Sequence, residues 1–172
     1  MGITTCITGS CKKNGIYNYS DLATVSTPID VDADTDTVIT NDAAGSLTTV
    51  QFGAQGINTI YNGVTNTFDF SQLQLGDLVW IRCDFEITTE SNNQSANVFL
   101  DAAQGNVINY QLEWDSEVEY KSQTAHKFAV TSYIAMLNNE TINNPAQFKI
   151  NTDGDATIKV NGYLCKVERH GY

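Results

Sequence analysis

The sequence predicts an all-β protein built as an antiparallel sandwich or barrel, and three observations lead to this prediction. Apolar and polar residues alternate with a period of two in run after run along most of the chain. Gly, Asn, Asp and Ser separate these runs at short intervals, as turn residues do. No stretch carries the apolar stripe of an amphipathic helix, and no internal repeat is present. Many short strands with frequent turns favour a sandwich or barrel.

The clearest strand covers residues 77–88. Alternate positions are apolar and are expected to face the core: Val79, Ile81, Cys83, Phe85 and Ile87. The intervening positions are expected to face solvent, among them Arg82, Asp84 and Glu86. This period of two is typical of a strand with one buried and one wet side.

Further strands follow with turns between them. They are expected over residues 38–39, 47–52, 97–100, 107–112, 148–150 and 156–167, with a long strand from His126 to Met136. Tyr133 and Leu137 lie on the opposite face of that long strand. In the last strand the apolar parity changes at Gly162, which predicts a β-bulge there. Asp153-Gly154-Asp155 is expected to form a hairpin turn.

Residues 1–26 differ from the rest because they lack a period-two run and carry Lys12-Lys13, the only adjacent basic pair. We expect an N-terminal extended arm over 1–26 and one β domain over 27–172. The residues expected to anchor the arm to a partner are Ile3, Ile7, Lys12, Lys13, Ile16 and Tyr17. A disordered tail and a strand that laces subunits together are the alternatives.

The composition limits the partners. The chain has 9 Lys and Arg against 20 Asp and Glu, a net charge of −11, so its surface repels nucleic acid and anionic membranes. No apolar run is long enough to span a bilayer, and the first residues lack the pattern of a signal peptide. We therefore expect synthesis in the cytoplasm.

The second half of the chain resembles a known family of domains. It combines Gly76-Asp77 before an amphipathic strand, Ser91-Asn92-Asn93-Gln94 as a hairpin tip, Asn144-Pro145-Ala146 before a strand, and residues 152–163 leading to a strand that ends at Arg169. This pattern resembles the tumour-necrosis-factor-like jelly-roll domains of bacteriophage virion proteins, over roughly residues 65–169.

The resemblance implies a homotrimeric structural protein on the virion surface, and it implies no active site or cofactor. One domain without a long shaft favours a head decoration (cement) protein or a short head fibre over a tail fibre. In that case the arm attaches to the major capsid protein or another virion protein. The alternative is a receptor- or carbohydrate-binding fibre tip that contacts a host surface glycan.

Two groups of residues could bind metal, and neither fits a known metal motif. Cys6 and Cys11 lack the tight pairing and further ligands of a zinc site, and a disulfide between them remains open. The four aspartates between Asp30 and Asp36 could attract calcium, but the spacing lacks the Gly and Glu of an EF-hand loop. We expect a solvent-facing acidic row and no metal.

No catalytic motif is present. The two histidines, His126 and His170, have no nucleophile elbow or zinc-binding partner motif beside them, so we expect no enzyme. The aromatic residues could form a sugar-binding platform or fill the core and a subunit interface. Trp114, between Glu113 and Asp115, is the candidate for an exposed ring that contacts a ligand.

Overall fold

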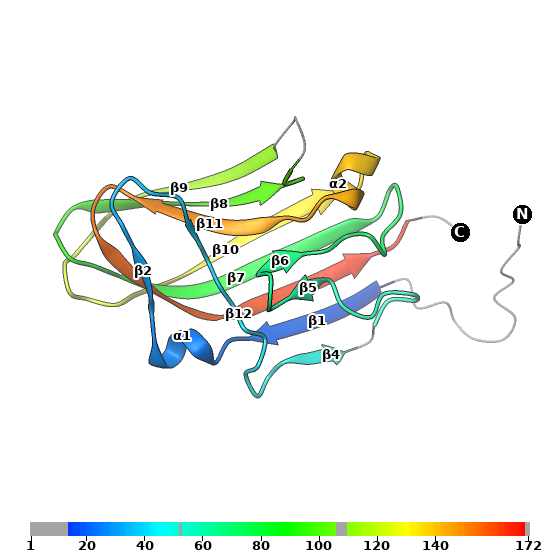
Figure 1. The fold of residues 1–172 in the computed structure, drawn as a ribbon, viewed down its shortest axis with the longest axis horizontal. Coiled ribbons are helices and arrows are strands. Elements are labelled where there is room, and N and C mark those ends of the chain that lie inside the picture. Colours follow the sequence, from blue (N-terminus) through cyan, green and yellow to red (C-terminus); the bar gives the residue numbers. More distant parts are fainter. Residues whose placement is uncertain (1–13, 52, 106–109, 171–172) are drawn as a thin grey trace, which may run out of the picture.

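The computed structural model describes residues 14–51, 53–105 and 110–170, and it describes residues 51 and 110–120 by their backbone alone. Two antiparallel sheets face each other as the layers of a sandwich (Figure 1). The predicted all-β jelly roll is confirmed. The described residues contain no helix with the length and apolar character that a membrane crossing requires.

The elements have the following bounds. Sheet A contains, in spatial order, β10 (His126–Ala135), β7 (Leu78–Thr89), β12 (Ala156–Glu168), β1 (Asn14–Ser20) and β4 (Thr49–Gln51), and β2 (Ile29–Val31) also pairs with β12. Sheet B contains β3 (Thr37–Val38), β11 (Gln147–Thr152), β8 (Gln94–Ala102) and β9 (Tyr110–Tyr120). A small ribbon pairs β5 (Tyr61–Asn62) with β6 (Thr67–Phe68), and the short helices are α1 (Ala23–Ser26) and α2 (Asn139–Asn143).

The chain changes sheet at most connections in its second half. It passes from β7 in sheet A to β8 in sheet B, from β9 back to β10, and then through β11 to β12. Two expected hairpins are therefore wrong, because the turns at 91–94 and 153–155 join strands of different sheets. Both sides of β7 are already occupied by β10 and β12, so β8 has no place beside it.

The core lies between the sheets and follows the predicted alternation. The five apolar residues predicted to be buried on β7 are all 0% exposed: Val79, Ile81, Cys83, Phe85 and Ile87. The bulge at Gly162 is confirmed by a shift in the β12–β7 register between Val160 and Gly162. A Cβ atom there would lie 2.7 Å from the backbone oxygen of Tyr19, so this close approach requires glycine.

The expected boundary between arm and domain at residue 26 is wrong, because β1 is an interior strand of sheet A. It pairs with β12 on one side and β4 on the other. Gly15, Tyr17 and Tyr19 face the core, and Tyr17 is 0% exposed. The strand is short, and the apolar Ile16 lies on its outward side, so the apolar–polar alternation is weak. Residues 1–13 lie outside the described part of the chain.

A long segment with little regular structure, residues 39–77, covers one flank of the sandwich. Tyrosine hydroxyls from the sheets and the segment itself bind its backbone. The Tyr17 hydroxyl donates to Ile57 O at 3.0 Å and accepts from Ala54 N at 3.1 Å. The Tyr163 hydroxyl donates to Ile39 O at 3.0 Å. We call residues 39–77 the tethered segment.

The end of the tethered segment is joined to the C-terminal end of sheet A by a buried ion pair. Arg169 Nε lies 3.2 Å from Asp77 Oδ2, and the two side chains are 6% and 1% exposed. Asp77 Oδ1 accepts the backbone N–H of His170, and Oδ2 accepts that of Gln74. Arg169 also donates to the backbone oxygen of Gln55. The ion pair therefore holds the loops at Gln55 and Gln74 against the end of β12.

Candidate interaction surface

The outer face of sheet A carries exposed apolar side chains on neighbouring strands, interrupted by Lys166. The register places Ile16, Lys166, Trp80 and Tyr133 side by side on four neighbouring strands. The rings of Trp80 and Tyr133 stack with centroids 5.1 Å apart and an angle of 29° between planes. Trp80 is 42% exposed and Tyr133 is 55% exposed.

The exposed apolar side chains of this face define the aromatic face: Ile16, Trp80, Tyr133 and Leu164. Leu164 lies on β12 beside Arg82 of β7, one row from the stacked rings. Leu164 is diagonal to Trp80, so these two side chains and Tyr133 lie together, whereas Lys166 separates them from Ile16. An apolar patch bordered by polar residues marks an interaction site more often than scattered single residues do.

The charges on the outer face of sheet A balance. Four basic and four acidic side chains occupy its outward positions: Arg82, Lys127, Lys159 and Lys166, and Asp30, Asp84, Glu86 and Glu168. Several pair within the face, since Arg82 lies 2.6 Å from Asp84 and Lys166 contacts Glu168. The Asp84 carboxylate raises the pKa of Arg82. The net charge of −11 therefore comes from other parts of the chain.

A shallow pocket adjoins the aromatic face at the edge strand β10. It has a volume of about 420 Å³, and Tyr133 and Leu137 line it together with residues at the start of α2. Asn138 caps that helix, because its side chain accepts the N–H of Thr141 at 2.8 Å. Leu137 is exposed. The pocket thus extends the apolar surface around the edge of sheet A.

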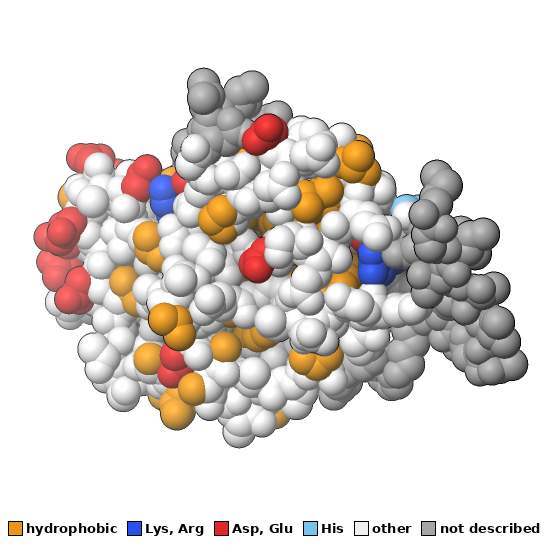
Figure 2. All heavy atoms as spheres, turned by 45° about the vertical axis from the view of Figure 1, so that its right-hand side comes forward, with side chains coloured by type: hydrophobic (Ala, Val, Ile, Leu, Met, Phe, Trp, Pro, Cys, Tyr) orange, Lys and Arg blue, Asp and Glu red, His pale blue; other side chains and the backbone are white. Residues whose placement is uncertain are grey.

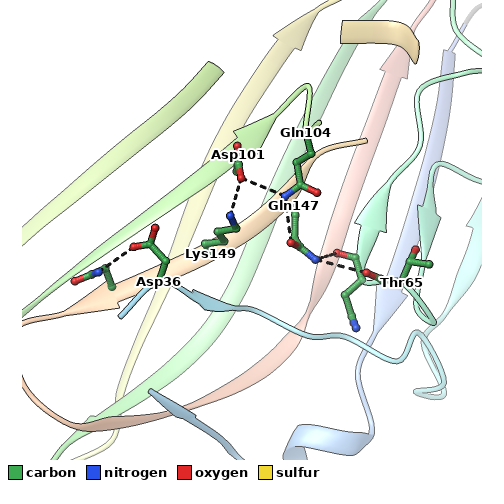
Figure 3. A network of polar contacts seen from close by, with 8 residues as sticks. Asp36, Thr65, Asp101, Gln104, Gln147 and Lys149 are labelled. Carbon is green, nitrogen blue, oxygen red and sulfur yellow. Dashed lines mark hydrogen bonds and ion pairs between the residues drawn. The ribbon is translucent and has the colours of Figure 1, made fainter. Parts of the chain in front are cut away.

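The outer face of sheet B differs, because it carries a polar network (Figure 3) beside Phe99, which is 4% exposed. Asp101 of β8 binds Lys149 of β11 at 2.7 Å and accepts from Gln104. The Gln104 amide also donates to Gln147, which in turn donates to the backbone oxygen of Asn66. Asp101 is buried, and its Oδ1 atom has no hydrogen-bond partner among the described residues. The polar side chains of this network therefore bond mainly to other groups of the same chain.

Acidic side chains gather at one end of the molecule (Figure 2). Backbone and side-chain contacts bring together the loops at 32–36, 90 and 153–155: Ala33 N donates to Asp155, Asp34 N donates to Thr152 O, and Glu90 N donates to Asp155 O. The four aspartates from Asp30 to Asp36 are exposed, although only Asp30 lies in a strand. We call this region the acidic end.

The structure separates the residues predicted to anchor the chain. Ile16 lies on the aromatic face and is 39% exposed, whereas Tyr17 is fully buried and cannot dock into a partner. Ile3, Ile7, Lys12 and Lys13 fall outside the described residues, as do Cys6 and Cys11.

The predicted ligand contacts lie on β9. The register pairs Glu113 with Phe99, Trp114 with Val98 and Asp115 with Asn97. The side chains of residues 110–120 lie outside the described part, so their role as ligand contacts stays a prediction. The exposed ring of Trp80 was not predicted from the sequence. It has the parity of Arg82 on a strand already predicted to have one wet side, and this signal was sufficient to find it.

The described residues show no group of three or more His, Cys, Asp or Glu arranged to hold a metal ion. Cys83 and Cys165 are free thiols in the core, and burial raises the pKa of both.

No protein-family profile matches the sequence, and no curated protein sequence is similar to it. Solved structures share the fold. The VP2 subviral particle protein of infectious bursal disease virus aligns with a TM-score of 0.50 at 9% identity, over 98% of this chain and 36% of that chain. This chain thus spans about a third of VP2.

Two other solved structures align over nearly the whole of both chains. The PRD1 vertex protein P5 gives a TM-score of 0.41 at 13% identity, over 95% of this chain and 100% of that chain. The Eiger TNF of S. frugiperda gives 0.40 at 7% identity, over 92% and 93%. At 9% identity the VP2 alignment shows a shared fold alone, and that fold is a jelly roll.

Proposed function

We propose that the chain is a structural protein of a bacteriophage particle, either a head decoration (cement) protein or a short head-fibre protein. It forms a homotrimer on the virion surface and attaches to the major capsid protein, or to another virion protein, through residues 1–13. The observation that supports this most is that nearly the whole chain is one jelly roll similar to the VP2 protein of a subviral particle.

The positions of the chain ends fit attachment at one end of the sandwich. β1 begins at Asn14, which pairs with Glu168 at the end of β12 (Figure 1). The first described residue, Asn14, therefore lies beside the end of the C-terminal strand, whereas the acidic end lies at the opposite end of the long strands. A particle bound near the chain ends would leave the acidic end facing outward.

The test is attachment to virions produced without this chain. The full chain should co-sediment with such particles, and a chain that begins at residue 14 should remain folded by circular dichroism but stay in solution. Co-sedimentation of the shortened chain at full affinity would place the contact on the jelly roll. Failure of the full chain to bind would reject the virion role.

A second candidate function is a receptor- or carbohydrate-binding fibre tip, and the exposed stack of Trp80 on Tyr133 favours it. Aromatic rings stack on the apolar faces of sugars, with neighbouring polar side chains bonding the hydroxyls. Glycan-array binding that is lost in Trp80→Ala, with no attachment to particles, would favour this function over the first.

A further inference from the structure

We propose that the aromatic face is the surface through which the chain binds a second copy of itself. This inference rests on the structural role proposed above and gives the expected self-association a site. The rings of Trp80 and Tyr133, with Ile16 and Leu164, remain open to solvent in the single chain. Large aromatic side chains bury more area than any others and dominate interface energetics.

The aromatic face is already organised for binding. Trp80 and Tyr133 are paired positions on adjacent strands, and each ring restricts the rotamers of the other by stacking. The strands beneath them are the long ladders of sheet A, whose inner side is fully packed. A partner therefore meets rings that lose little conformational entropy on contact, which favours association.

The charge distribution favours a second copy of the chain as the partner that binds the aromatic face. The outer face of sheet A has no net charge, while the rest of the chain carries the excess of acidic groups. A neutral face meets a second copy with little repulsion, whereas a contact between two acidic surfaces brings like charges together. A basic partner would instead be drawn to the acidic end.

The pocket at the edge of β10 adds a second, different surface next to the first. Tyr133 belongs to both, and Leu137 continues the apolar lining toward α2. If the face of one copy packs against the pocket edge of the next, the contact is head-to-tail, and such contacts can close into a ring. This geometry fits the expected homotrimer, with a mass of three times 18.9 kDa.

The experiment is sedimentation velocity of the purified full chain over a range of concentrations reaching on the order of 100 μM. The unmodified chain should form a defined oligomer. Tyr133→Asp and Leu164→Asp should each weaken association by about 30-fold or more, because each puts a charge into a buried contact. The matched control is Val64→Asp, at a side chain 93% exposed in the β5–β6 turn, which should associate normally.

A measurement on the unmodified chain guards against variants that misfold. Trp80 should become less accessible to acrylamide as the concentration rises, with Trp80→Phe supplying the contribution of Trp114. A chain that stays monomeric throughout overturns the inference. So does an oligomer that survives both substitutions, or protection of Trp80 that requires an added glycan.

The two proposals fail separately. A monomeric chain that still attaches to particles through residues 1–13 rejects the aromatic face as a self-association surface and leaves the virion role standing. A defined oligomer that never attaches to particles supports the surface and rejects that role.

Discussion

The two halves of this protein are held together by different means. From Leu78 to Glu168 the chain is mostly long strands, and β7 is flanked on both sides by ladders with β10 and β12. The tethered segment has only short strands, and its backbone is bound by side chains: Tyr17 holds Ala54 and Ile57, and Tyr61 holds Asn41. From Leu78 to Glu168, ladders between strands supply the hydrogen bonds of the backbone. In the tethered segment, individual tyrosine hydroxyls supply several of them.

The difference teaches where each half is vulnerable. A ladder distributes its hydrogen bonds over many residues, so its stability depends mainly on the apolar side chains packed between the sheets. In the tethered segment a single hydroxyl can satisfy two buried backbone groups, so deleting one oxygen atom leaves both unpaired. We therefore expect truncations of core side chains to have the largest effects in the ladders of residues 78–168. Deletions of tyrosine hydroxyls should matter most in the tethered segment.

The largest expected effect comes from removing β1. A chain that begins at residue 27 should fail to fold, because it loses the strand between β12 and β4 together with Tyr17 and Tyr19. A chain that begins at residue 14 should keep the circular dichroism spectrum and cooperative urea transition of the full chain. A folded, cooperative product starting at 27 would show that the tethered segment needs no support from β1.

Phe85→Ala tests the ladder half. Phe85 is 0% exposed and contacts Phe128 across the β7–β10 pair. We expect a loss of about 3–5 kcal/mol in the free energy of unfolding, from lost burial and the cavity left behind. Urea denaturation measures it. A loss below about 1 kcal/mol would mean that the core collapses around the smaller side chain.

Asp77→Asn tests the connection between the halves. The substitution removes the carboxylate charge that lies 3.2 Å from the buried Arg169 guanidinium, which should cost about 3–5 kcal/mol. Asp34→Asn, at an exposed position in the acidic end, is the control and should stay within about 0.5 kcal/mol. Equal urea midpoints for the two variants would contradict a structural role for the buried pair.

Tyr17→Phe tests a single tether. It removes one hydroxyl and leaves Ala54 N and Ile57 O unpaired, so about 1–3 kcal/mol should be lost. Amide exchange at Ala54 should accelerate more than exchange in β7. Tyr133→Phe, which changes an exposed ring, should leave both quantities unchanged. Uniform acceleration across the sheets would mean that the tether acts on global stability alone.

High pH should lower the stability of the protein through the buried tyrosines that bind the tethered segment. Burial raises the pKa of Tyr19 to about 12, and burial also raises the pKa values of Tyr61 and Tyr163. Above the ordinary pKa near 10 the unfolded chain loses phenolic protons that the folded chain retains, so stability falls as pH rises from about 10 toward 12.

The expected slope is about 1.4 kcal/mol per pH unit for each buried tyrosine. Urea denaturation at a series of values between about pH 8 and 11 measures this slope in the free energy of unfolding. Tyr19→Phe should have a shallower slope than the unmodified chain, and an identical slope would contradict a protonated, buried Tyr19.

Much of sheet A could be predicted from the sequence. Alternation over 77–88 identified the buried and wet faces of β7, and the parity change at Gly162 identified the bulge. These predictions succeed because a strand with one wet side must repeat every two residues, and a bulge must restore the facing. The same rule, applied to Trp80, would have put its ring on the wet side, although the ring was not predicted to be exposed.

Only the tertiary structure decided how the strands are shared between layers. Ser91–Gln94 and Asp153–Gly154 have the composition of hairpin turns, but both cross between sheets because the strands they leave already have partners on both sides. The place of β1 in the core and the stacking of Trp80 on Tyr133 likewise depend on pairing between residues more than 50 positions apart. Local alternation specifies the facing of a strand but carries no information about its distant neighbours, because partner choice follows from burying all the apolar faces at once.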